Sequence, residues 1–417
     1  MANNTDTLQP ATANRGWIVT CAGIGINLAL GVLYTWSMFK GAIEKDFGWA
    51  GEKLNDPYAL CCLVFAFAMI LAGRCQDKFG PRLTASIGGL LVAAGMILIS
   101  RTNNYAVWVL GFGVLVGTGI GFGYSSATPP ALKWFPPSKT GLIAGLVVAG
   151  FGLAPVYLSP LSQYLLKYYT LQNAMLFFGI AFLVIVCGLA QLLVNPPAGY
   201  TVAAKSGAAK PAAASSTPSQ ILRTPSFWLL WVLYFIGAGA GLMVISSISP
   251  MAKKSMGEWA FVAVAVTAIG NAAGRIGAGL LSDKIGRRWT LMIVLLCQAA
   301  LMFIAIPVTG SKDMVAVVIV LVATLIGFNY GANLSLFPSF TKDLWGLKSF
   351  GVNYGFVFTA WGVGGFVFSR VQQTLVAGSA TKSYASSFVL AGVLLLVGAA
   401  LTFLIKPPQP KAAAVPA

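Results

Sequence analysis

One arginine stands deep inside an apolar stretch of the sequence. Arg275 lies about three quarters of the way along an apolar run at 259–281, flanked by alanine, glycine and isoleucine. Burying an arginine at such depth in a membrane costs roughly 2.5–3.5 kcal/mol, so these residues usually face a cavity. The planar guanidinium can hold a carboxylate through two hydrogen bonds. The sequence therefore predicts carboxylate binding at Arg275; the alternative is a side chain that reaches the membrane surface near Asp283, two helical turns away.

Asn271 precedes this arginine by four residues, a spacing that places both side chains on one face of a helix. An amide can hydrogen-bond a ligand but cannot take up a proton near neutral pH. No Asp or Glu stands at mid-depth in any apolar run, and Glu258 lies roughly 25 Å along the same helix. Proton uptake would therefore need the ligand itself or a carboxylate outside these runs.

Other reactive residue types are scarce. The chain has no histidine, which excludes histidine metal ligands, histidine proton relays and a Ser-His-Asp triad. Its six cysteines lie in or at the ends of apolar runs, where packing as small hydrophobic side chains is expected. We expect no catalytic constellation, no metal and no cofactor.

The elements that would position these residues are long apolar helices. Of the 417 residues, 57% are hydrophobic and only 9% are charged, which excludes a soluble enzyme and a nucleic-acid-binding domain. A bilayer core needs roughly 20 apolar residues per helix. Twelve such runs are predicted, at 17–39, 57–76, 83–100, 106–128, 141–166, 171–194, 226–249, 259–281, 289–308, 314–337, 350–372 and 383–405. This pattern indicates an all-α, multi-pass membrane protein.

The distribution of Lys and Arg predicts the orientation. The loops that share a side with both termini carry 16 of these residues, and the opposite loops carry 9. Positive residues accumulate on the cytoplasmic side, so both termini are expected there. Most of the net charge of +17 is then an orientation signal and indicates no nucleic-acid partner.

The two halves of the chain repeat each other at an offset of about 206–211 residues. The segment 73–82 (GRCQDKFGPR) recurs at 279–288 (GLLSDKIGRR). This repeat predicts two six-helix bundles at 17–194 and 226–405, between cytoplasmic tails at 1–16 and 406–417. The stretch 195–225 is rich in Ala, Pro, Ser and Lys and is expected to be a flexible cytoplasmic linker.

The repeated G-x-x-x-D-K-F/I-G-x-R segment resembles the signature loop of the major facilitator superfamily. In that fold the loop holds the two bundles together on the cytoplasmic side. The resemblance implies this latch role for five residues of this chain: Asp77, Arg82, Asp283, Arg287 and Arg288. The aspartate of each copy can cap a helix N-terminus and pair with nearby arginine. The alternative is a pair of short basic loops that serve orientation only.

Three further segments narrow the resemblance to one branch. Residues 134–145 (WFPPSKTGLIAG), 31–36 (GVLYTW) and 222–228 (LRTPSFW) are similar to monocarboxylate transporters and oxalate/formate antiporters. The chain looks like a bacterial lactate–proton symporter related to the animal carriers, although its entry to the first span lacks their acidic, glycine-rich pattern.

The resemblance also implies a pocket. Arg275 matches the anion-binding arginine of the family, whereas Asn271 stands where animal carriers have a proton-carrying aspartate. Trp361 stands where oxalate/formate antiporters have a second intramembrane cation, so a monocarboxylate is favoured over a dianion. Spans 1, 4, 7 and 10 usually line the site, which adds Tyr330, Phe337, Tyr124, Leu28, Tyr34 and Asn333 as candidates. Interhelical packing is the alternative role for each of them.

Together these features lead to one expectation and two rivals. We expect a secondary transporter in the inner (plasma) membrane that moves a small monocarboxylate, L-lactate or a close relative, with protons by alternating access. It is expected to work as a monomer within the lipid bilayer. The rivals are an electroneutral organic-anion exchanger and a membrane sensor that transports nothing.

Overall fold

The regular structure of the described residues is entirely helical. The computed structural model describes residues 9–49, 51–197, 200, 216–245, 256–310, 316–379 and 383–405. The predicted tail at 406–417, residues 1–8 of the predicted N-terminal tail and most of the predicted linker at 195–225 lie outside these residues. Part of the predicted N-terminal tail is helical, because α1 begins at Gln9.

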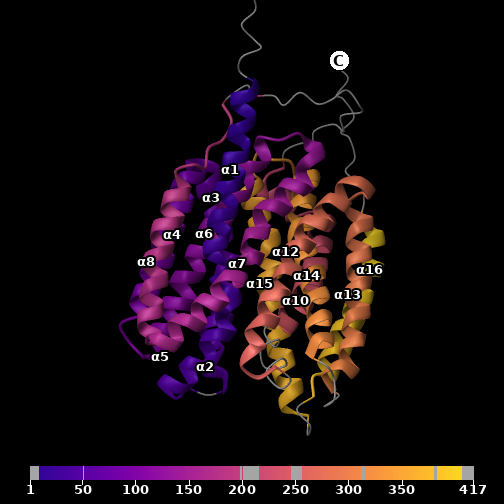
Figure 1. Ribbon diagram of the computed structural model, residues 1–417. Helices are drawn as coiled ribbons and strands as arrows, with labels where there is room; N and C mark the ends of the chain where they lie inside the picture. The colour runs from indigo at the N-terminus through magenta and orange to yellow at the C-terminus, as the bar shows by residue number, and fades with distance from the viewer. Residues whose placement is uncertain are drawn as a thin grey trace, which may run out of the picture.

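Fifteen α-helices are described (Figure 1). Most of their bounds lie within a few residues of the predicted runs, but α1 begins well before 17, α14 ends well after 337, and α9 lies inside the predicted linker. In chain order they are α1 (Gln9–Leu30), α2 (Trp36–Phe47), α3 (Asp56–Phe79), α4 (Pro81–Ile99), α5 (Tyr105–Trp108), α6 (Gly117–Lys133), α7 (Thr140–Tyr168), α8 (Leu171–Ala190), α9 (Pro218–Ile221), α10 (Pro225–Ile245), α12 (Ala260–Ile285), α13 (Arg287–Gly310), α14 (Ala316–Trp345), α15 (Phe350–Ala377) and α16 (Ala385–Leu401). A π-helical segment, η3 (Val109–Val116), joins α5 to α6, and 3₁₀ turns form η1 (Gly31–Thr35), η2 (Gly51–Leu54), η4 (Pro137–Lys139), η5 (Gly257–Trp259) and η6 (Thr402–Leu404).

Within the described ranges, eleven helical segments are long and apolar enough to cross a membrane. They match every predicted run except the one at 350–372. The helix in that place, α15, has 28 residues, but its glycines, amides and polar aromatic side chains lower its hydropathy. The structure therefore supports eleven spans by length and composition, and the twelfth stays a prediction.

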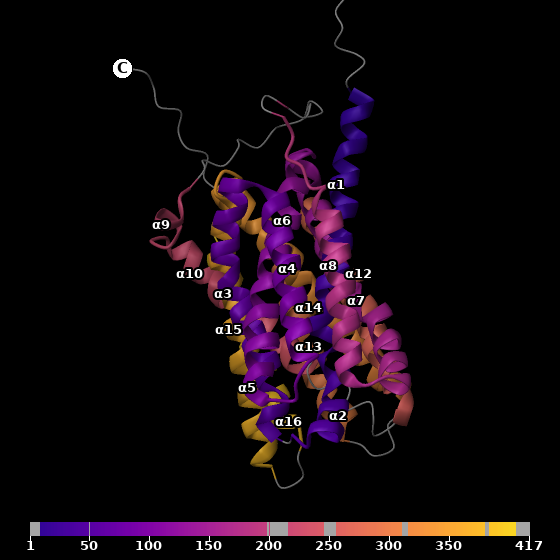
Figure 2. The same cartoon turned by 90° about the vertical axis from the view of Figure 1, so that its left-hand side faces the viewer.

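The helices up to residue 190 and those from residue 225 onward lie on two sides of the molecule. Figure 1 shows α1 to α8 on one side and α10 to α16 on the other, with α7 and α15 near the middle. Two long helix pairs join the sides: α15 packs along α3, and α12 packs along α7. In Figure 2, α3 and α15 run side by side along one edge. These two pairs carry the repeated segment and the buried arginine.

Glycines allow the paired helices to approach closely at one end. Gly73 of α3 faces Gly351 of α15, and Gly141 of α7 faces Gly279 of α12; a Cβ at Gly73, Gly141 or Gly279 would overlap the facing backbone. Such contact between small residues is how helices pack in a membrane, where no hydrophobic force drives them together. The close approach brings the repeated loops of each side against helix starts of the other side.

Candidate functional site

Arg275 is fully buried in the middle of α12, with 0% of its surface exposed. Its Nε donates to Asn271 Oδ1 at 3.0 Å, as the four-residue spacing predicts. Its Nη1 donates to the backbone carbonyl oxygen of Val148 in α7. Its Nη2 lies 3.5 Å from the hydroxyl of Tyr34 in η1. The guanidinium therefore reaches from the second half of the chain to two elements of the first half.

A second contact between the halves lies beside this arginine. The hydroxyl of Tyr34 lies 2.5 Å from that of Tyr330 in α14, and Trp361 Nε1 in α15 donates to the Tyr330 hydroxyl at 2.9 Å. All three side chains are buried, as is Arg275. The ring of Tyr34 packs edge-on against Phe151 at 5.0 Å between centroids. Arg275, Tyr34, Tyr330 and Trp361 thus form a continuous polar network enclosed by aromatic rings.

The partners of Arg275 are all neutral oxygens. Among the residues that the structure describes, no Asp or Glu forms an ion pair with it. A buried cation without a counter-charge is costly unless hydrogen bonds satisfy it. An amide, a carbonyl and a phenol supply those bonds here, so an anion that displaced the phenol would gain a charge-assisted bond.

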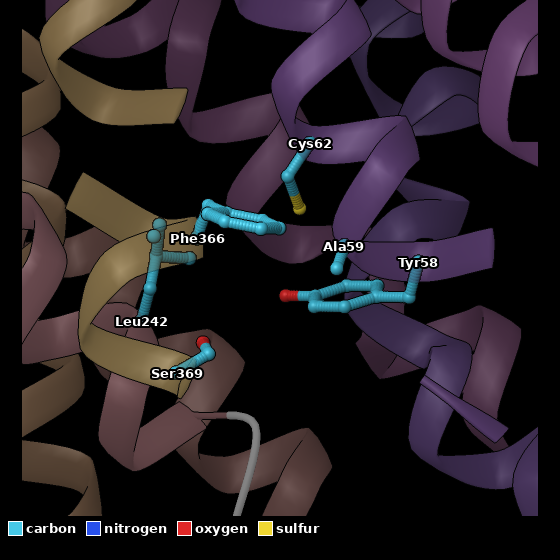
Figure 3. A pocket seen from close by; sticks show the side chains of 7 residues that line it. Tyr58, Ala59, Cys62, Leu242, Phe366 and Ser369 are labelled. Carbon is cyan, nitrogen blue, oxygen red and sulfur yellow. The ribbon is translucent and has the colours of Figure 1, made fainter. Parts of the chain in front are cut away.

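Two cavities lie between the joined helices. Figure 3 shows the first, between α3 on one side and α10 and α15 on the other; it is lined by Tyr58, Ala59, Cys62, Leu242, Gly365, Phe366 and Ser369. The second lies between α12 and α7 and touches three neighbours of Arg275. It is lined by Tyr34, Gly152, Pro155, Ile245, Val264, Thr267, Ala268 and Asn271.

The repeated aspartates cap helices of the opposite side. Asp283 accepts bonds from the backbone N–H groups of Gly141 and Leu142 at 3.1 Å each, the second and third residues of α7. Asp77 accepts from Gly351 and Val352 at 3.4 and 3.3 Å, again the second and third residues of α15. A carboxylate at a helix N-terminus accepts hydrogen bonds from free N–H groups and is attracted by the positive end of the helix dipole.

The arginines of the repeated loops have unequal partners. Arg287 pairs with Asp283 at 2.6 Å and with Asp343 of α14 at 3.0 Å. Arg82 donates instead to the carbonyl oxygen of Leu193 at 3.3 Å. Arg288 lies over the rings of Trp289 and Phe403. Of the three arginines predicted in the latch, Arg287 is thus the one seen in an ion pair with a loop aspartate.

An ion pair also joins α3 and α15, toward the end of these helices that lies away from Asp77. Arg370 of α15 contacts Asp56, the first residue of α3, at 2.8 Å, and Tyr105 donates its hydroxyl to the same carboxylate at 2.6 Å. The α3–α15 pair is therefore joined by a carboxylate at each end. The first cavity lies between Asp56 and the aromatic rings that enclose the polar network.

These features agree with a family match over most of the chain: residues 18–369 match the Major Facilitator Superfamily. The chain belongs to the major facilitator superfamily. Solved structures agree in fold: the Major Facilitator Superfamily transporter FucP in its outward conformation superposes with a TM-score of 0.66 at 15% identity, covering 94% of this chain and 99% of the other. The relatives of this chain include membrane transporters, so this chain is a multi-pass membrane transporter and not an enzyme.

Relatives of this transporter point to one branch of the superfamily. An uncharacterized transporter of Escherichia coli (strain K12), YhjX, is 30% identical and covers 84% of this chain and 85% of its own. The oxalate:formate antiporter of Oxalobacter formigenes is 27% identical, covering 86% and 84%. Monocarboxylate transporter 13 of Bos taurus is 24% identical, covering 94% and 89%. The branch predicted from the sequence is confirmed.

The transporter brings together half of the eight predicted pocket residues. Arg275, Asn271, Tyr34 and Tyr330 are linked by hydrogen bonds. Tyr124 is buried in the surrounding aromatic layer, with its ring 5.4 Å from that of Phe151.

The remaining three candidates make contacts elsewhere. Phe337 stacks on Tyr234 at 4.0 Å. Asn333 donates to Gln298 and to its own helix. Leu28 is partly exposed, and its carbonyl oxygen accepts a bond from Tyr157.

Three residues at the site are not among the candidates that the sequence predicts. Val148 takes part through its backbone carbonyl, which no side-chain pattern reports. Trp361 stands out in the sequence only as the place of a missing cation, yet it donates to Tyr330. Thr267 lines the second cavity and stands four residues before Asn271, so the spacing of polar residues in α12 could have indicated it.

Proposed function

We propose that this transporter moves a small monocarboxylate, L-lactate or a close relative, together with protons. The halves rock by alternating access around a central site, and Arg275 binds the carboxylate. The observation that carries this proposal is the buried guanidinium of Arg275, whose partners are neutral oxygens from both halves. The monocarboxylate transporters and the oxalate:formate antiporter among its relatives support an organic anion as substrate.

The charge of the site favours a single carboxylate. Arg275 is a buried cation with neutral partners, and the position where oxalate/formate antiporters have a second cation is held by Trp361, which donates a neutral N–H to Tyr330. One cation balances one carboxylate, whereas a dianion would keep a desolvated charge without compensation. We therefore favour a monocarboxylate over oxalate. Tyr124 and Tyr330 would contribute hydroxyl groups and the aromatic layer would exclude water.

The partners of Arg275 also favour symport over obligatory exchange. Because Asn271, Val148 and Tyr34 satisfy the guanidinium with the chain's own oxygens, the halves can close around it without an anion. A carrier of this kind can return empty, which net uptake requires. Asn271 cannot carry the proton, so the proton would travel on the substrate acid or on another carboxylate. The alternative is an electroneutral organic-anion exchanger, suggested by the oxalate:formate antiporter relative.

The membrane topology is part of the same proposal. We take α15 as the twelfth span, because it packs along α3 and α10 as a spanning helix would. Two bundles at 17–194 and 226–405, cytoplasmic termini and the inner membrane then follow from the repeat and from the Lys and Arg distribution. The end of the molecule with Asp77 and Asp283 would be cytoplasmic, and the protein would act as a monomer.

Uptake into proteoliposomes tests the proposal. We expect L-lactate to enter empty vesicles under an inward proton gradient, and Arg275→Gln to abolish this uptake while the protein still reconstitutes. Arg101→Gln, at an exposed arginine between α4 and α5, is the matched control and should keep wild-type uptake. Uptake that requires anion inside the vesicle would favour the exchanger. Wild-type uptake by Arg275→Gln would overturn the site.

A further inference from the structure

The second cavity contains a polar group that no contact described above uses. Thr267 of α12 lines this cavity together with Asn271 and Tyr34. Only 5% of its surface is exposed, and among the described residues its Oγ1 has no hydrogen-bond partner. Its methyl group lies against Gly327 of α14. A buried hydroxyl without a partner is costly, so a ligand that supplies one gains affinity.

The geometry of α12 places this hydroxyl in line with Arg275. Thr267, Asn271 and Arg275 follow each other at intervals of four residues, which puts them on one face of the helix. Each interval rises about 6 Å. Helical side chains lean toward the N-terminus, and the Arg275 guanidinium accordingly reaches Asn271. The cavity therefore begins beside the guanidinium, and Thr267 stands one helical turn beyond it.

Apolar side chains form the other walls of this cavity. Val264, Ala268, Ile245 and Pro155 supply apolar surface. A molecule whose carboxylate rests on the guanidinium would direct its second carbon toward this cavity.

The first cavity can be compared with the second, because the sequence repeat relates the residues that line them. Val264 and Ala268 stand 206 residues after Tyr58 and Cys62, the same offset that separates Asp283 from Asp77. At this offset Met69 stands in the place of Arg275 and Cys61 in the place of Thr267. The first cavity (Figure 3) therefore lacks both the cation and the threonine hydroxyl that accompany the second. The two groups occur together in one of the two related sites.

We propose that Thr267 is a specificity-determining residue whose hydroxyl binds the oxygen on the second carbon of the substrate. The transporter would then select short 2-hydroxy and 2-oxo monocarboxylates over acids without that oxygen. This inference rests on the proposed function, since it requires the carboxylate to lie on Arg275.

Thr267→Val keeps the shape of the side chain and removes the hydroxyl, and Thr267→Ser keeps the hydroxyl. Uptake of L-lactate, pyruvate and propionate is measured for each variant in proteoliposomes. We expect Thr267→Val to raise the KM for lactate and pyruvate about 5- to 10-fold, with the KM for propionate within twofold of wild type. Thr267→Ser should keep wild-type discrimination. Thr20→Val is the matched control, because Thr20 is buried in α1 and its hydroxyl already donates to Gly16.

Two results would distinguish a failure of this inference from a failure of the proposed function. Equal changes in the KM of lactate and propionate, or no change in either, would overturn the role of Thr267 and leave Arg275 as the carboxylate site. A wild-type protein that transports none of the three acids would overturn both proposals.

Discussion

The hydroxyl groups of Tyr34 and Tyr330 lie 2.5 Å apart, although 296 positions separate the two residues in the chain. One comes from the 3₁₀ turn that follows α1 and the other from α14, so this bond joins the two halves at their centre. The Tyr34 hydroxyl also faces the Nη2 of Arg275. A change in the hydrogen bonds of Arg275 would therefore also affect the contact between the two halves.

This coupling predicts a selective defect in Tyr34→Phe. The variant loses one neutral acceptor for Arg275, so the closed, anion-free carrier becomes less stable by about 1 kcal/mol. Net lactate uptake should fall about 5-fold, whereas exchange of lactate for lactate, which needs no empty return, should stay close to wild type. Both are measured in the same vesicles. Tyr157→Phe, at an exposed tyrosine bonded to Leu28, serves as control. Equal loss of uptake and exchange would contradict the coupling.

The sequence predicts the parts of this network that lie within one helix and misses those that lie between helices. The four-residue spacing of Asn271 and Arg275 is enough to predict their contact, because helical geometry fixes it. Tyr330 and Phe337 share a face by spacing, but seven residues carry Phe337 roughly 10 Å along α14, where it meets Tyr234.

The path of the first span shows the same limit. The 3₁₀ turn at Gly31–Thr35 changes the helical register between Leu28 and Tyr34, and only the tyrosine joins the network. The predicted run at 350–372 lies within α15, but α15 is not among the helices that are apolar enough to be recognised as membrane spans. Which carbonyl or ring meets a side chain from another helix depends on packing that periodicity does not contain.

Asn271→Asp should create a new dependence on pH. The substituted carboxylate would pair with the Arg275 Nε, 3.0 Å from the present Oδ1, and compete with the substrate. Protonation removes that competing charge, so uptake should rise as the pH falls through the pKa of the new carboxyl. At pH 7 the KM for lactate should be at least about 10-fold above wild type, measured as uptake against external pH. Asn173→Asp, at the exposed start of α8, should leave the profile unchanged.

The repeated aspartates should each protect a helix of the other half. Asp283→Asn removes the charge that caps α7, and Asp77→Asn removes the charge that caps α15. Loss of a cap weakens the first helical turn by about 1 kcal/mol. Hydrogen–deuterium exchange should therefore speed up about 5-fold at 140–146 in the first variant and at 350–356 in the second.

The Asp283→Asn effect should be the larger one, because its hydrogen bonds are shorter and its carboxylate also pairs with Arg287. Glu44→Gln, at an exposed acid of α2, provides the background rate. Faster exchange confined to the helix that carries the substituted residue would disprove the crossed capping.

The Asp56–Arg370 pair should control access to the first cavity. It joins the first residue of α3 to the last third of α15. Cys62 of α3 lines the first cavity (Figure 3). The two side chains are 25% and 33% exposed, so their pairing contributes at most about 1 kcal/mol. In a protein that keeps Cys62 as its single cysteine, Asp56→Asn and Arg370→Gln should each speed labelling by a membrane-impermeant maleimide about 3- to 5-fold. The double variant should label no faster than the quicker single variant, because both substitutions break one interaction. Multiplicative acceleration in the double variant would show that the two residues act independently and that the pair does not close this end of the transporter.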